Sequence, residues 1–456
     1  MQIATELGRR AAALRFDDLP PEAVHWAKVA LLDTIGVTLA GAREQAPQRA
    51  ALALAAGPGP ALVFGGRERA GILDAALING VSSHVLDFDD CNNTIGGHPS
   101  VPILPGLIAL AERDNSTGRD LLVAYVAGFE TETRIARAVH FHHYEKGWHP
   151  TATLGVFGAA AAASRLLGLD GERTAIAIAI AASFASGIKA NFGTMVKSLH
   201  VGHCARNGLY AALLASHGFT ANAGAFEHPQ GFLEVFNGAG NYDASRALAG
   251  WGEPFDIVVP GIAIKQYPCC GSTHPALDAM IALVRRHQVV PDQVERIEAW
   301  IHARRLAHTN RPQPASALDS KFSLQYCLVR ALLDRQIVLE QFEGDGQDAG
   351  WRDPRVAGLL GRVHVAPYGD DQFDPSNHFG GEVKVTLRDG RVLQEKVEQP
   401  LGRTSANPLP VARLREKFAA CAQRALPAGR IAELVARIEA FETEPDVGAF
   451  TRSLES

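Results

Sequence analysis

The sequence predicts a mainly α-helical protein in which a large helical domain is joined to a smaller α+β domain. Two observations carry this prediction. Up to about residue 240, apolar residues recur three and four positions apart, which is the spacing of one helix face. Beyond Pro260, alternating apolar patterns and an Asp389-Gly390 hairpin signal appear between helical segments, which is typical of an α+β unit.

The elements of the helical domain follow from apolar spacing and from capping residues. The spacing predicts a helix over residues 23–40. Thr117 and Asp120 form a capping-box pattern that opens one helix, and Asp170 opens another. The Gly- and Ala-rich stretch 155–163 predicts tightly packed helices at the centre of the domain, since tertiary packing must offset the cost of glycine in a helix.

The α+β domain is predicted from strand and helix patterns that follow one another. Expected strands lie at residues 294–303, 362–365, 382–387 and 391–397, and expected helices at 274–286 and 323–333. After Pro408 the helical pattern returns at 411–425 and 428–441, and we expect these helices to pack on the first domain. The predicted boundaries are residues 1–265 completed by 400–456 for the helical domain, and 266–399 for the α+β domain.

Composition excludes several classes of protein. The chain has 456 residues, of which 47% are hydrophobic and 20% charged, with a net charge of -5, as in globular proteins with a sizeable core. So small a charge excess argues against a nucleic-acid partner. The N-terminus lacks the apolar core of a secretory signal, and the most apolar stretch, residues 175–188, is too short to span a membrane. We therefore expect a cytoplasmic protein without a membrane partner.

Known cofactor and metal motifs do not occur in the sequence. The six cysteines form no C-x-x-C pair, which argues against a zinc or iron–sulfur site and against a disulfide scaffold. The sequence also has no P-loop, no dinucleotide fingerprint and no nucleophile elbow. We therefore expect no cofactor and no metal.

One segment, residues 84–100, gathers many polar side chains between apolar helices, and we call it the site loop. It holds three carboxylates, two histidines and two asparagines, and its Gly-Gly and His-Pro pairs predict a loop. Polar loops on rigid scaffolds commonly carry functional sites, although Asp and Asn also cap helices and turns. A metal site is a third interpretation, but the helical His-x-x-x-His spacing is missing from this segment.

Two further clusters lie in the helical domain. His149 precedes the Gly- and Ala-rich helix, and the free N–H groups at a helix N-terminus favour binding of an anion beside this histidine. The alternative interpretation is that His149 is a packed or capping histidine without a role in binding. Lys197 and His200 are three positions apart and share a face if a helix starts there. Because their neighbours are small and apolar, we do not expect Lys197 to lie on a solvent-exposed helix face. Both residues are therefore candidates for binding a carboxylate.

Two more clusters lie at and beyond the domain boundary, where ligand sites are common. The first runs from Lys265 to His274 and contains Cys269 and Cys270; a thiolate beside a histidine permits nucleophilic catalysis, but adjacent cysteines are usually packed thiols. The second contains Tyr326, which is either a phenolic proton donor or a core tyrosine.

Four motifs occur along the chain in a fixed order. They are Asp87-Phe88-Asp89-Asp90 followed by Gly97-His98-Pro99-Ser100, Lys197-x-x-His200-x-Gly202, Lys265-x-Tyr267-Pro268 leading to Thr273-His274, and Ser323-x-Gln325-Tyr326. By these motifs the chain resembles the MmgE/PrpD family, which includes 2-methylcitrate dehydratase, cis-aconitate decarboxylase and iminodisuccinate epimerase. The resemblance runs almost end to end and implies a large helical domain, a smaller α+β lid domain and a homodimer.

The resemblance also implies particular site residues. Positions that match the active site of the family's decarboxylase are Asp87, His98, His149, Lys197, Lys265 and Tyr326. Two positions depart from it, because Cys91 stands where the decarboxylase has a threonine and Cys270 where it has a histidine. The stretch between Cys91 and His98 is also one residue longer.

The residues and the resemblance together predict a lyase of this family, of the dehydratase or decarboxylase type. We expect it to act without a cofactor on a small di- or tricarboxylate related to 2-methylcitrate or aconitate. Negative charge develops beside a carboxylate in such reactions, so preorganised cations and donors must stabilise it. The expected acid–base residues are Asp87, His98, His274 and Tyr326, and the expected substrate-binding residues are Cys91, His149, Lys197, His200, Lys265 and Cys270. The alternatives are an epimerase of an imino- or amino-dicarboxylate and a non-catalytic carboxylate-binding homologue.

Overall fold

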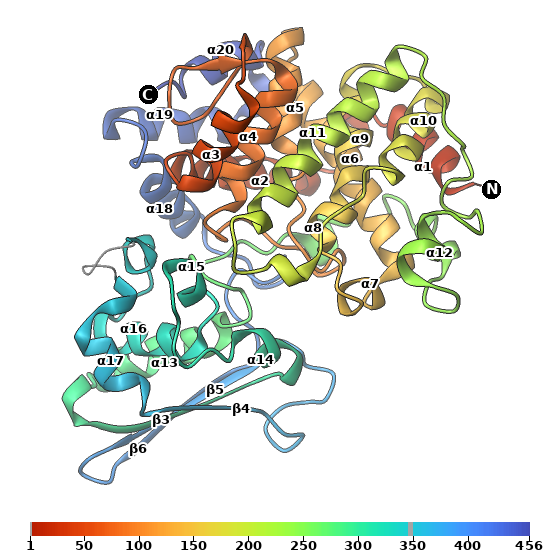
Figure 1. Ribbon diagram of the computed structural model, residues 1–456. Helices are drawn as coiled ribbons and strands as arrows, with labels where there is room; N and C mark the ends of the chain where they lie inside the picture. Colours follow the sequence, from red (N-terminus) through yellow and green to blue (C-terminus); the bar gives the residue numbers. More distant parts are fainter. Residues whose placement is uncertain (1, 345–349) are drawn as a thin grey trace. The chain divides into compact units, whose positions relative to one another are not determined.

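The computed structural model describes residues 2–344 and 350–456, and these residues divide into two units (Figure 1). Unit 1 comprises the residues up to Ile264 together with Thr404–Ala406 and Pro410–Ser456, and unit 2 comprises Lys265–Arg403 and Asn407–Leu409. The C-terminal helices therefore belong to unit 1. The boundaries differ from the expected ones at Lys265 and at residues 400–403 and 407–409, which belong to unit 2.

Unit 1 consists mainly of α-helices (Figure 1). Its helices are α1 (Ile3–Ala13), α2 (Pro21–Gly41), α3 (Gln45–Leu54), α4 (Ile72–His84), α5 (Leu104–Asp114), α6 (Gly118–Val139), α7 (His142–Glu145), α8 (Pro150–Thr153), α9 (Gly155–Leu166), α10 (Gly171–Ala182), α11 (Val196–Ser216), α12 (Phe232–Asn237), α18 (Val411–Ala422), α19 (Ala428–Glu439) and α20 (Val447–Arg452). A short antiparallel pair, β1 (Pro58–Leu62) and β2 (Arg69–Ala70), joins α3 to α4 and has no clear strand pattern in the sequence.

Both predicted helix caps are confirmed. The Thr117 hydroxyl accepts a hydrogen bond from the Asp120 backbone N–H at 3.2 Å, and the Asp120 carboxylate accepts one from the Thr117 N–H at 3.2 Å. The Asp170 carboxylate accepts a hydrogen bond from the Arg173 N–H at 2.8 Å. Each side chain satisfies N–H groups that have no partner within the first helical turn, and this fixes where α6 and α10 begin.

Small residues bring the central helices of unit 1 into close contact, as predicted. A Cβ atom on Gly80 of α4 would lie 2.8 Å from the Gly202 Cα of α11. A Cβ atom on Gly128 of α6 would lie 2.5 Å from the Gly158 carbonyl oxygen of α9. Larger residues at these crossings would push the helices apart, so the Gly- and Ala-rich composition sets the spacing that places the site loop.

Helix α2 runs through the core of unit 1. Among the described helices, α2 is long and apolar enough to cross a membrane by length and composition, but 78% of its most apolar window is buried, as in a core helix of a globular protein. Helix α18 packs against it where Gly36 leaves room, since a Cβ there would lie 3.1 Å from the Phe418 ring. The C-terminal segment thus completes the core begun by α2.

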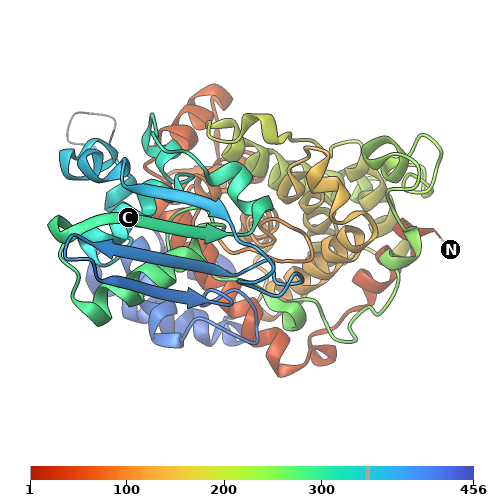
Figure 2. The ribbon, with the colours of Figure 1, turned by 90° about the horizontal axis from the view of Figure 1, so that it is seen from below.

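Unit 2 combines helices with a mixed sheet (Figure 2). Its elements are α13 (His274–His287), β3 (Val294–Ile301), α14 (Ala303–Thr309), α15 (Ala317–Ser320), α16 (Leu324–Asp334), α17 (Pro354–Leu360), β4 (Val363–Pro367), β5 (Gly381–Leu387) and β6 (Val392–Val397). Among the described residues the strand order is β4-β3-β5-β6; β3 runs parallel to β4 and antiparallel to β5, and β6 is antiparallel to β5. The mainly α fold with an α+β C-terminal part is therefore confirmed.

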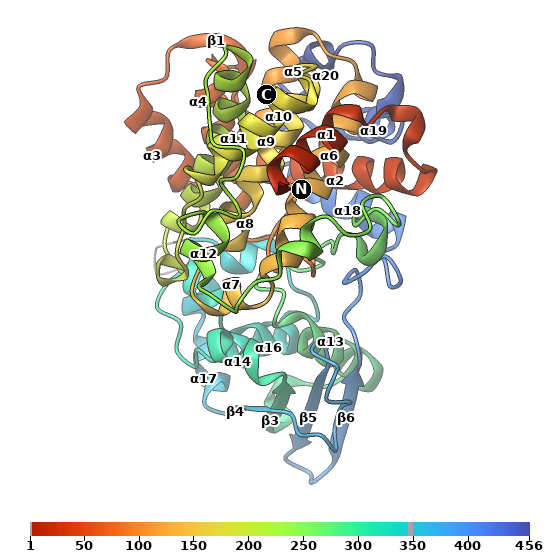
Figure 3. The ribbon, with the colours of Figure 1, turned by 90° about the vertical axis from the view of Figure 1, so that its right-hand side faces the viewer.

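The sheet of unit 2 buries one face against α13 and α16 (Figure 3). Ile297, Ala299 and Ile301 of β3 alternate toward this core, as the sequence pattern predicts. The Asp389-Gly390 hairpin between β5 and β6 is also confirmed, and Gly390 adopts a φ of +87° that suits glycine in a tight turn.

Candidate active site

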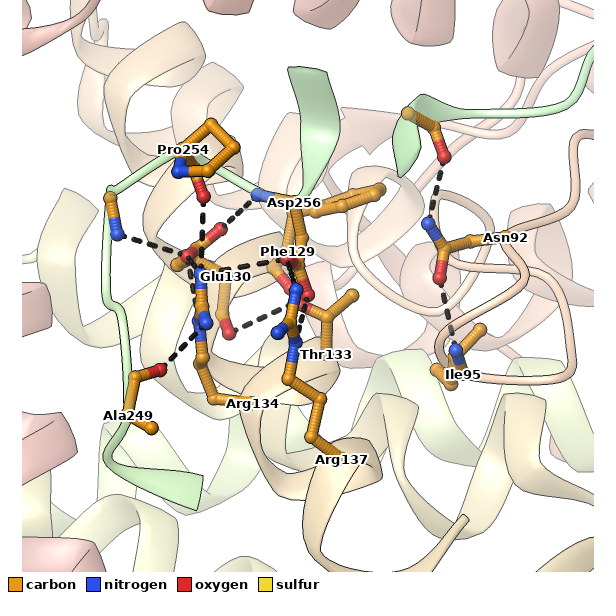
Figure 4. A network of polar contacts seen from close by, with 12 residues as sticks. Asn92, Ile95, Phe129, Glu130, Thr133, Arg134, Arg137, Ala249, Pro254 and Asp256 are labelled. Atoms are coloured by element: carbon orange, nitrogen blue, oxygen red, sulfur yellow. Dashed lines mark hydrogen bonds and ion pairs between the residues drawn. The ribbon is translucent and has the colours of Figure 1, made fainter. Parts of the chain in front are cut away.

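The site loop leaves α4 at His84 and is held in place through its backbone. Cys91 pairs with Ala263, with N–H to oxygen distances of 2.8 and 2.6 Å. The Asn92 side chain donates to the Gly261 carbonyl at 2.8 Å and accepts from the Ile95 N–H at 2.9 Å (Figure 4). These bonds fix both the middle of the loop and the turn that follows it.

The segment that holds the site loop is itself anchored to α6 (Figure 4). Arg134 donates to the Ala249 carbonyl at 2.7 Å, and the Glu130 carboxylate accepts from the Asp256 N–H at 2.8 Å. Arg137 donates to the Asp256 carboxylate at 3.1 Å. Because Arg134 and Glu130 are almost fully buried, this network ties residues 249–261 rigidly to the helical core.

A buried ion pair joins the site loop to α11. The Lys197 ammonium donates to the Asp87 carboxylate, and both side chains are less than a tenth exposed. Asp87 has a φ of +52°, a left-handed conformation that non-glycine residues seldom adopt and that tends to occur at functional sites. Lys197, singled out from the sequence because of its apolar neighbours, is therefore a buried cation with a defined counter-ion.

His98 lies beside this ion pair. Its Nε2 is 3.9 Å from Asp87 Oδ1, and its Nδ1 is 2.9 Å from Asp89 Oδ2. The Cys91 sulfur lies 3.8 Å from the same Nδ1 atom. The His98 backbone N–H donates to the Thr151 hydroxyl at 3.1 Å, which fixes the main chain at the histidine. The side chain is thus oriented by one carboxylate and faces another.

Asp89 also binds a second histidine. The His84 Nδ1 atom lies 2.8 Å from Asp89 Oδ2, the same oxygen that contacts His98. Burial lowers the pKa of His84 to about 3, so its ring is neutral at physiological pH. Burial opposes ionisation of Asp89, but the two imidazoles outweigh it and hold the pKa of this carboxyl well below its usual value. We refer to His84, Asp87, Asp89, His98 and Lys197 together as the acid–base cluster.

His149, the N-cap residue of α8, and His200 of α11 extend the acid–base cluster. Their Nδ1 atoms are 3.2 Å apart, and the His149 ring centroid lies 5.6 Å from that of His84. Burial, reinforced by nearby cationic groups, holds the pKa of His149 well below its usual value and lowers that of His200 to about 4. Both rings are neutral at physiological pH and can donate or accept a hydrogen bond, but neither supplies a positive charge to an anion.

A second carboxyl of the site loop is in the opposite protonation state. The Ser100 hydroxyl donates to Asp90 and lies 2.7 Å from the Tyr125 hydroxyl. Burial, with the neighbouring Asp33, raises the pKa of Asp90 well above its usual value, so this group is protonated. Glu132 on α6 behaves likewise, because burial raises its pKa and, among the described residues, its carboxyl oxygens have no hydrogen-bond partner.

Lys417 of α18 supports the site loop from the C-terminal segment. Its ammonium donates to the Phe88 carbonyl at 2.7 Å, lies 4.0 Å from the centre of the Phe88 ring and is 2.6 Å from Asp33 of α2. Phe88, which lies between Asp87 and Asp89, is therefore held by Lys417, a buried cation that is distant in sequence.

The remaining candidates lie in unit 2. Lys265 is buried, Cys270 is half-buried, and the Cys270 backbone N–H donates to the Lys321 carbonyl at 3.0 Å. His274 begins α13, its Nε2 lies 3.3 Å from the Cys269 carbonyl oxygen, and its ring packs edge-on against Tyr267. These residues belong to one well-connected segment of unit 2.

Tyr326 is in the interior of unit 2. Its hydroxyl donates to the Gln341 carbonyl and accepts a hydrogen bond from Arg330 Nε at 3.1 Å. Burial raises its pKa to about 12, and the side chain has no exposed surface. This geometry corresponds to the core-tyrosine interpretation of the sequence pattern, since the phenolic proton is already bonded within unit 2.

The His84, Asp89 and His98 ligand atoms lie within 4.8 Å of one another, a spacing that suits a metal ion. Both Nδ1 atoms, however, are at hydrogen-bond distance from one carboxylate oxygen, so hydrogen bonds account for their arrangement. We therefore describe these three side chains as a hydrogen-bonded group.

The structure thus brings together the predicted residues of unit 1, namely Asp87, Cys91, His98, His149, Lys197 and His200. Lys265, Cys270, His274 and Tyr326 lie in unit 2. His84 and Asp89 were not among the predicted site residues, although both belong to the site loop. The high density of polar residues in the loop, which identified it as a candidate site, includes His84 and Asp89. Spacing alone, however, does not show which carboxylate forms a hydrogen bond with which histidine.

Known proteins resemble this chain over most of its length. Residues 5–245 match the MmgE/PrpD N-terminal domain, and residues 267–440 match the MmgE/PrpD C-terminal domain. A cis-aconitate decarboxylase from Homo sapiens is 33% identical over 83% of this chain and 79% of its own length. A cis-aconitate decarboxylase from Aspergillus terreus is 29% identical over 95% of this chain and 91% of its own length, and one from Mus musculus is 32% identical over 83% and 78%.

A buried set of acids, bases and cations, together with these matches, defines the class of protein, which is an enzyme and specifically a lyase. Both matched domains are present in the order expected for one family. The chain belongs to the MmgE/PrpD family.

Proposed function

We propose that this lyase acts on an aconitate-like tricarboxylate and releases carbon dioxide by acid–base chemistry, without a metal or organic cofactor. The observation that carries the proposal is the position of His98, whose Nε2 faces Asp87 beside the buried Lys197. The relatives named cis-aconitate decarboxylase support the choice of substrate class.

In this mechanism Lys197 binds a substrate carboxylate. An ammonium group has three N–H donors, so Lys197 can contact Asp87 and a substrate carboxylate at once. Breaking the bond to the departing carboxylate leaves its electron pair on a substrate carbon. His98 Nε2 then gives a proton to that carbon, which forms a C–H bond and leaves a neutral imidazole. Lys265 and Cys270 stay predicted substrate contacts.

Incubation in deuterated water tests the proposal. Purified protein is given cis-aconitate, 2-methylcitrate or a succinate-type acid, and the products are followed by mass spectrometry. We expect loss of carbon dioxide from cis-aconitate, with one deuterium in the new C–H bond. Loss of water would instead identify a dehydratase, and deuterium gain without loss of mass would identify an epimerase.

Two cysteines provide a sharper test of substrate choice. Cys91 is 3.8 Å from His98, and the sequence resemblance places a threonine there in the decarboxylase and a histidine at Cys270. We expect Cys91→Thr combined with Cys270→His to raise decarboxylation of cis-aconitate relative to other acids. An unchanged or lower rate on cis-aconitate relative to the other acids would contradict this expectation.

Chelation tests the absence of a metal from the mechanism. We expect activity to survive EDTA treatment and dialysis, because the Nδ1 atoms of His84 and His98 and the Oδ2 atom of Asp89 are engaged in hydrogen bonds with one another. Loss of turnover that a divalent metal restores would contradict this part of the proposal.

The homodimer, the lid role of unit 2 and the cytoplasmic location stay predictions. Light scattering at micromolar concentration measures the oligomeric state directly. A mass equal to the 48.7 kDa of one chain would contradict the predicted homodimer.

A further inference from the structure

One carboxylate oxygen of the site loop is shared by two histidines. Asp89 Oδ2 lies 2.8 Å from His84 Nδ1 and 2.9 Å from His98 Nδ1. A carboxylate oxygen accepts two hydrogen bonds, but two ring nitrogens can share it only if each carries a proton. Both rings are therefore protonated on Nδ1. In His98 this leaves Nε2 as the atom that faces Asp87.

His84 keeps the Asp89 carboxylate ionised and in one orientation. Its ring is completely buried and neutral at physiological pH, so its Nδ1–H donates to Asp89 whatever the state of His98. It is fixed at the last residue of α4, and its ring packs edge-on against that of His98, with centroids 4.6 Å apart. Asp89 thus stays ionised and keeps its orientation while His98 gains or loses a proton.

The adjacent Asp90 provides an internal comparison. It is as deeply buried as Asp89, but its described hydrogen-bond partners are the hydroxyl and the backbone N–H of Ser100, with no imidazole among them. The two neighbouring carboxyls are therefore in opposite states, with Asp90 protonated and Asp89 ionised. The negative charge of this pair of carboxyls therefore lies on Asp89, which contacts His84 and His98.

The charges around His98 balance when this histidine is protonated. The titratable groups of unit 1 whose described contacts or electrostatic effects involve His98 or its neighbours are Asp87, Asp89 and Cys91 of its own loop, His84 of α4, His149 before α8, and Lys197 of α11. Asp87 is paired with Lys197, and His84 and His149 are neutral. An imidazolium at His98 would therefore neutralise the remaining charge, that of Asp89.

We propose that Asp89 is the positioning residue of the site, which fixes the His98 ring with Nε2 toward the substrate and stabilises the imidazolium that donates the proton. The inference rests on the proposed lyase function. In the step itself the Nε2–H bond breaks, the new C–H bond forms on the substrate carbanion, and His98 becomes neutral. Asp89 remains ionised throughout and does not take the proton, and water restores the proton on Nε2.

Asp89→Asn tests the proposal through turnover and its pH dependence. Loss of the carboxylate removes the counter-charge of the imidazolium and permits the wrong tautomer of His98. We expect kcat to fall by about 10²–10⁴-fold while KM changes by less than about threefold. The alkaline limb of the kcat profile should move to lower pH, since the uncompensated imidazolium loses its proton more readily. Asp89→Glu should recover part of the rate.

Asp90→Asn is the matched control. It removes a neighbouring carboxyl that is already protonated, so the kcat profile should keep the alkaline limb of the wild type. An Asp89→Asn enzyme with wild-type kcat and pH profile would overturn the inference while leaving the lyase function intact. The same shift of the limb in both variants would also overturn it.

Nitrogen-15 NMR of the imidazoles tests the geometry without substrate and without a variant. We expect the His98 signals of the wild-type protein to show a proton on Nδ1 and, above the alkaline limb, none on Nε2. A proton on Nε2 alone would overturn the inference even if Asp89→Asn failed to fold. If the protein turned over none of the carboxylates, the lyase proposal would be contradicted. The NMR result would still test the protonation of His98 independently.

Discussion

Charged side chains of the site loop bond to other ionisable side chains, whereas His274 and Tyr326 of unit 2 each bond to a backbone carbonyl as well as to a neighbouring side chain. In the site loop, Asp87 binds Lys197 and Asp89 binds two histidines. In unit 2, His274 contacts the Cys269 carbonyl and the Tyr326 hydroxyl donates to a carbonyl. A side chain that bonds to other ionisable groups sets their charge state, while one that bonds to backbone stabilises the fold. Substitutions in the two regions should therefore have different consequences.

The largest expected effect is that of His98→Asn in unit 1. If His98 delivers the proton, kcat should fall by about 10²–10⁴-fold. The thermal midpoint should change little, because the asparagine amide can still donate a hydrogen bond to Asp89. Turnover and thermal midpoint are measured on the same samples. A variant with a lower midpoint and full turnover per folded molecule would identify His98 as a structural residue and remove it from the site.

Lys197→Met should combine a loss of activity with a loss of stability. The Asp87 carboxylate would be left buried without its counter-ion, which costs about 3–5 kcal/mol of unfolding free energy. The lost contact to a substrate carboxylate should lower kcat/KM by roughly 10- to 150-fold. Adding Asp87→Asn to Lys197→Met should restore most of the stability and none of the activity. Recovery of both would mean that the ion pair serves the fold alone.

Tyr326→Phe should show the opposite pattern in unit 2. Removing the hydroxyl leaves the buried Gln341 carbonyl and the Arg330 Nε without this partner, at a cost of about 1–3 kcal/mol of unfolding free energy. We expect kcat per folded molecule to stay within about threefold of the wild-type value. A fall in kcat of a hundredfold at unchanged stability would instead support the predicted role of Tyr326 as a proton donor.

The smallest expected effect concerns Glu132, a buried acid outside the acid–base cluster. Burial raises its pKa well above the usual 4.5, so the folded state binds a proton that the unfolded state has already lost. The contribution of Glu132 to the stability of the wild type should therefore fall as pH rises above about 4.5, by about 1.4 kcal/mol per pH unit, until the folded-state pKa is reached. Glu132→Gln lacks this titration. The unfolding free energy of the variant minus that of the wild type should grow with pH in denaturant titrations, and a pH-independent difference would contradict the assignment.

Local features of the fold could be predicted from the sequence because they depend on neighbouring residues. The caps at Thr117 and Asp170 and the hairpin at Gly390 each depend on residues a few positions apart. The site loop was predicted for a similar reason, since its polar residues are concentrated in one short segment. The short pair of β1 and β2 has a burial pattern that does not alternate and was not predicted.

Pairings within the site could not be predicted, because they depend on tertiary packing. Nothing in the spacing of Asp87, Asp89 and Asp90 shows that the first binds a lysine, the second binds two histidines and the third is protonated. The difference arises from which helices surround each carboxyl. Tyr326 illustrates the same limit, since its partner carbonyl belongs to Gln341, outside the helix that the sequence pattern predicts.

The support that Lys417 gives to the site loop has a consequence for synthesis of the protein. Lys417 lies 329 positions after Phe88, whose carbonyl it binds. At a translation rate of about 5–20 residues per second, the loop is synthesised roughly 15–65 s before the lysine that supports it. During that interval the nascent chain already contains Asp87, Asp89 and His98 but lacks the cation that holds their loop. The site loop therefore acquires its full set of supporting contacts only when one of the last helices has been translated and has docked.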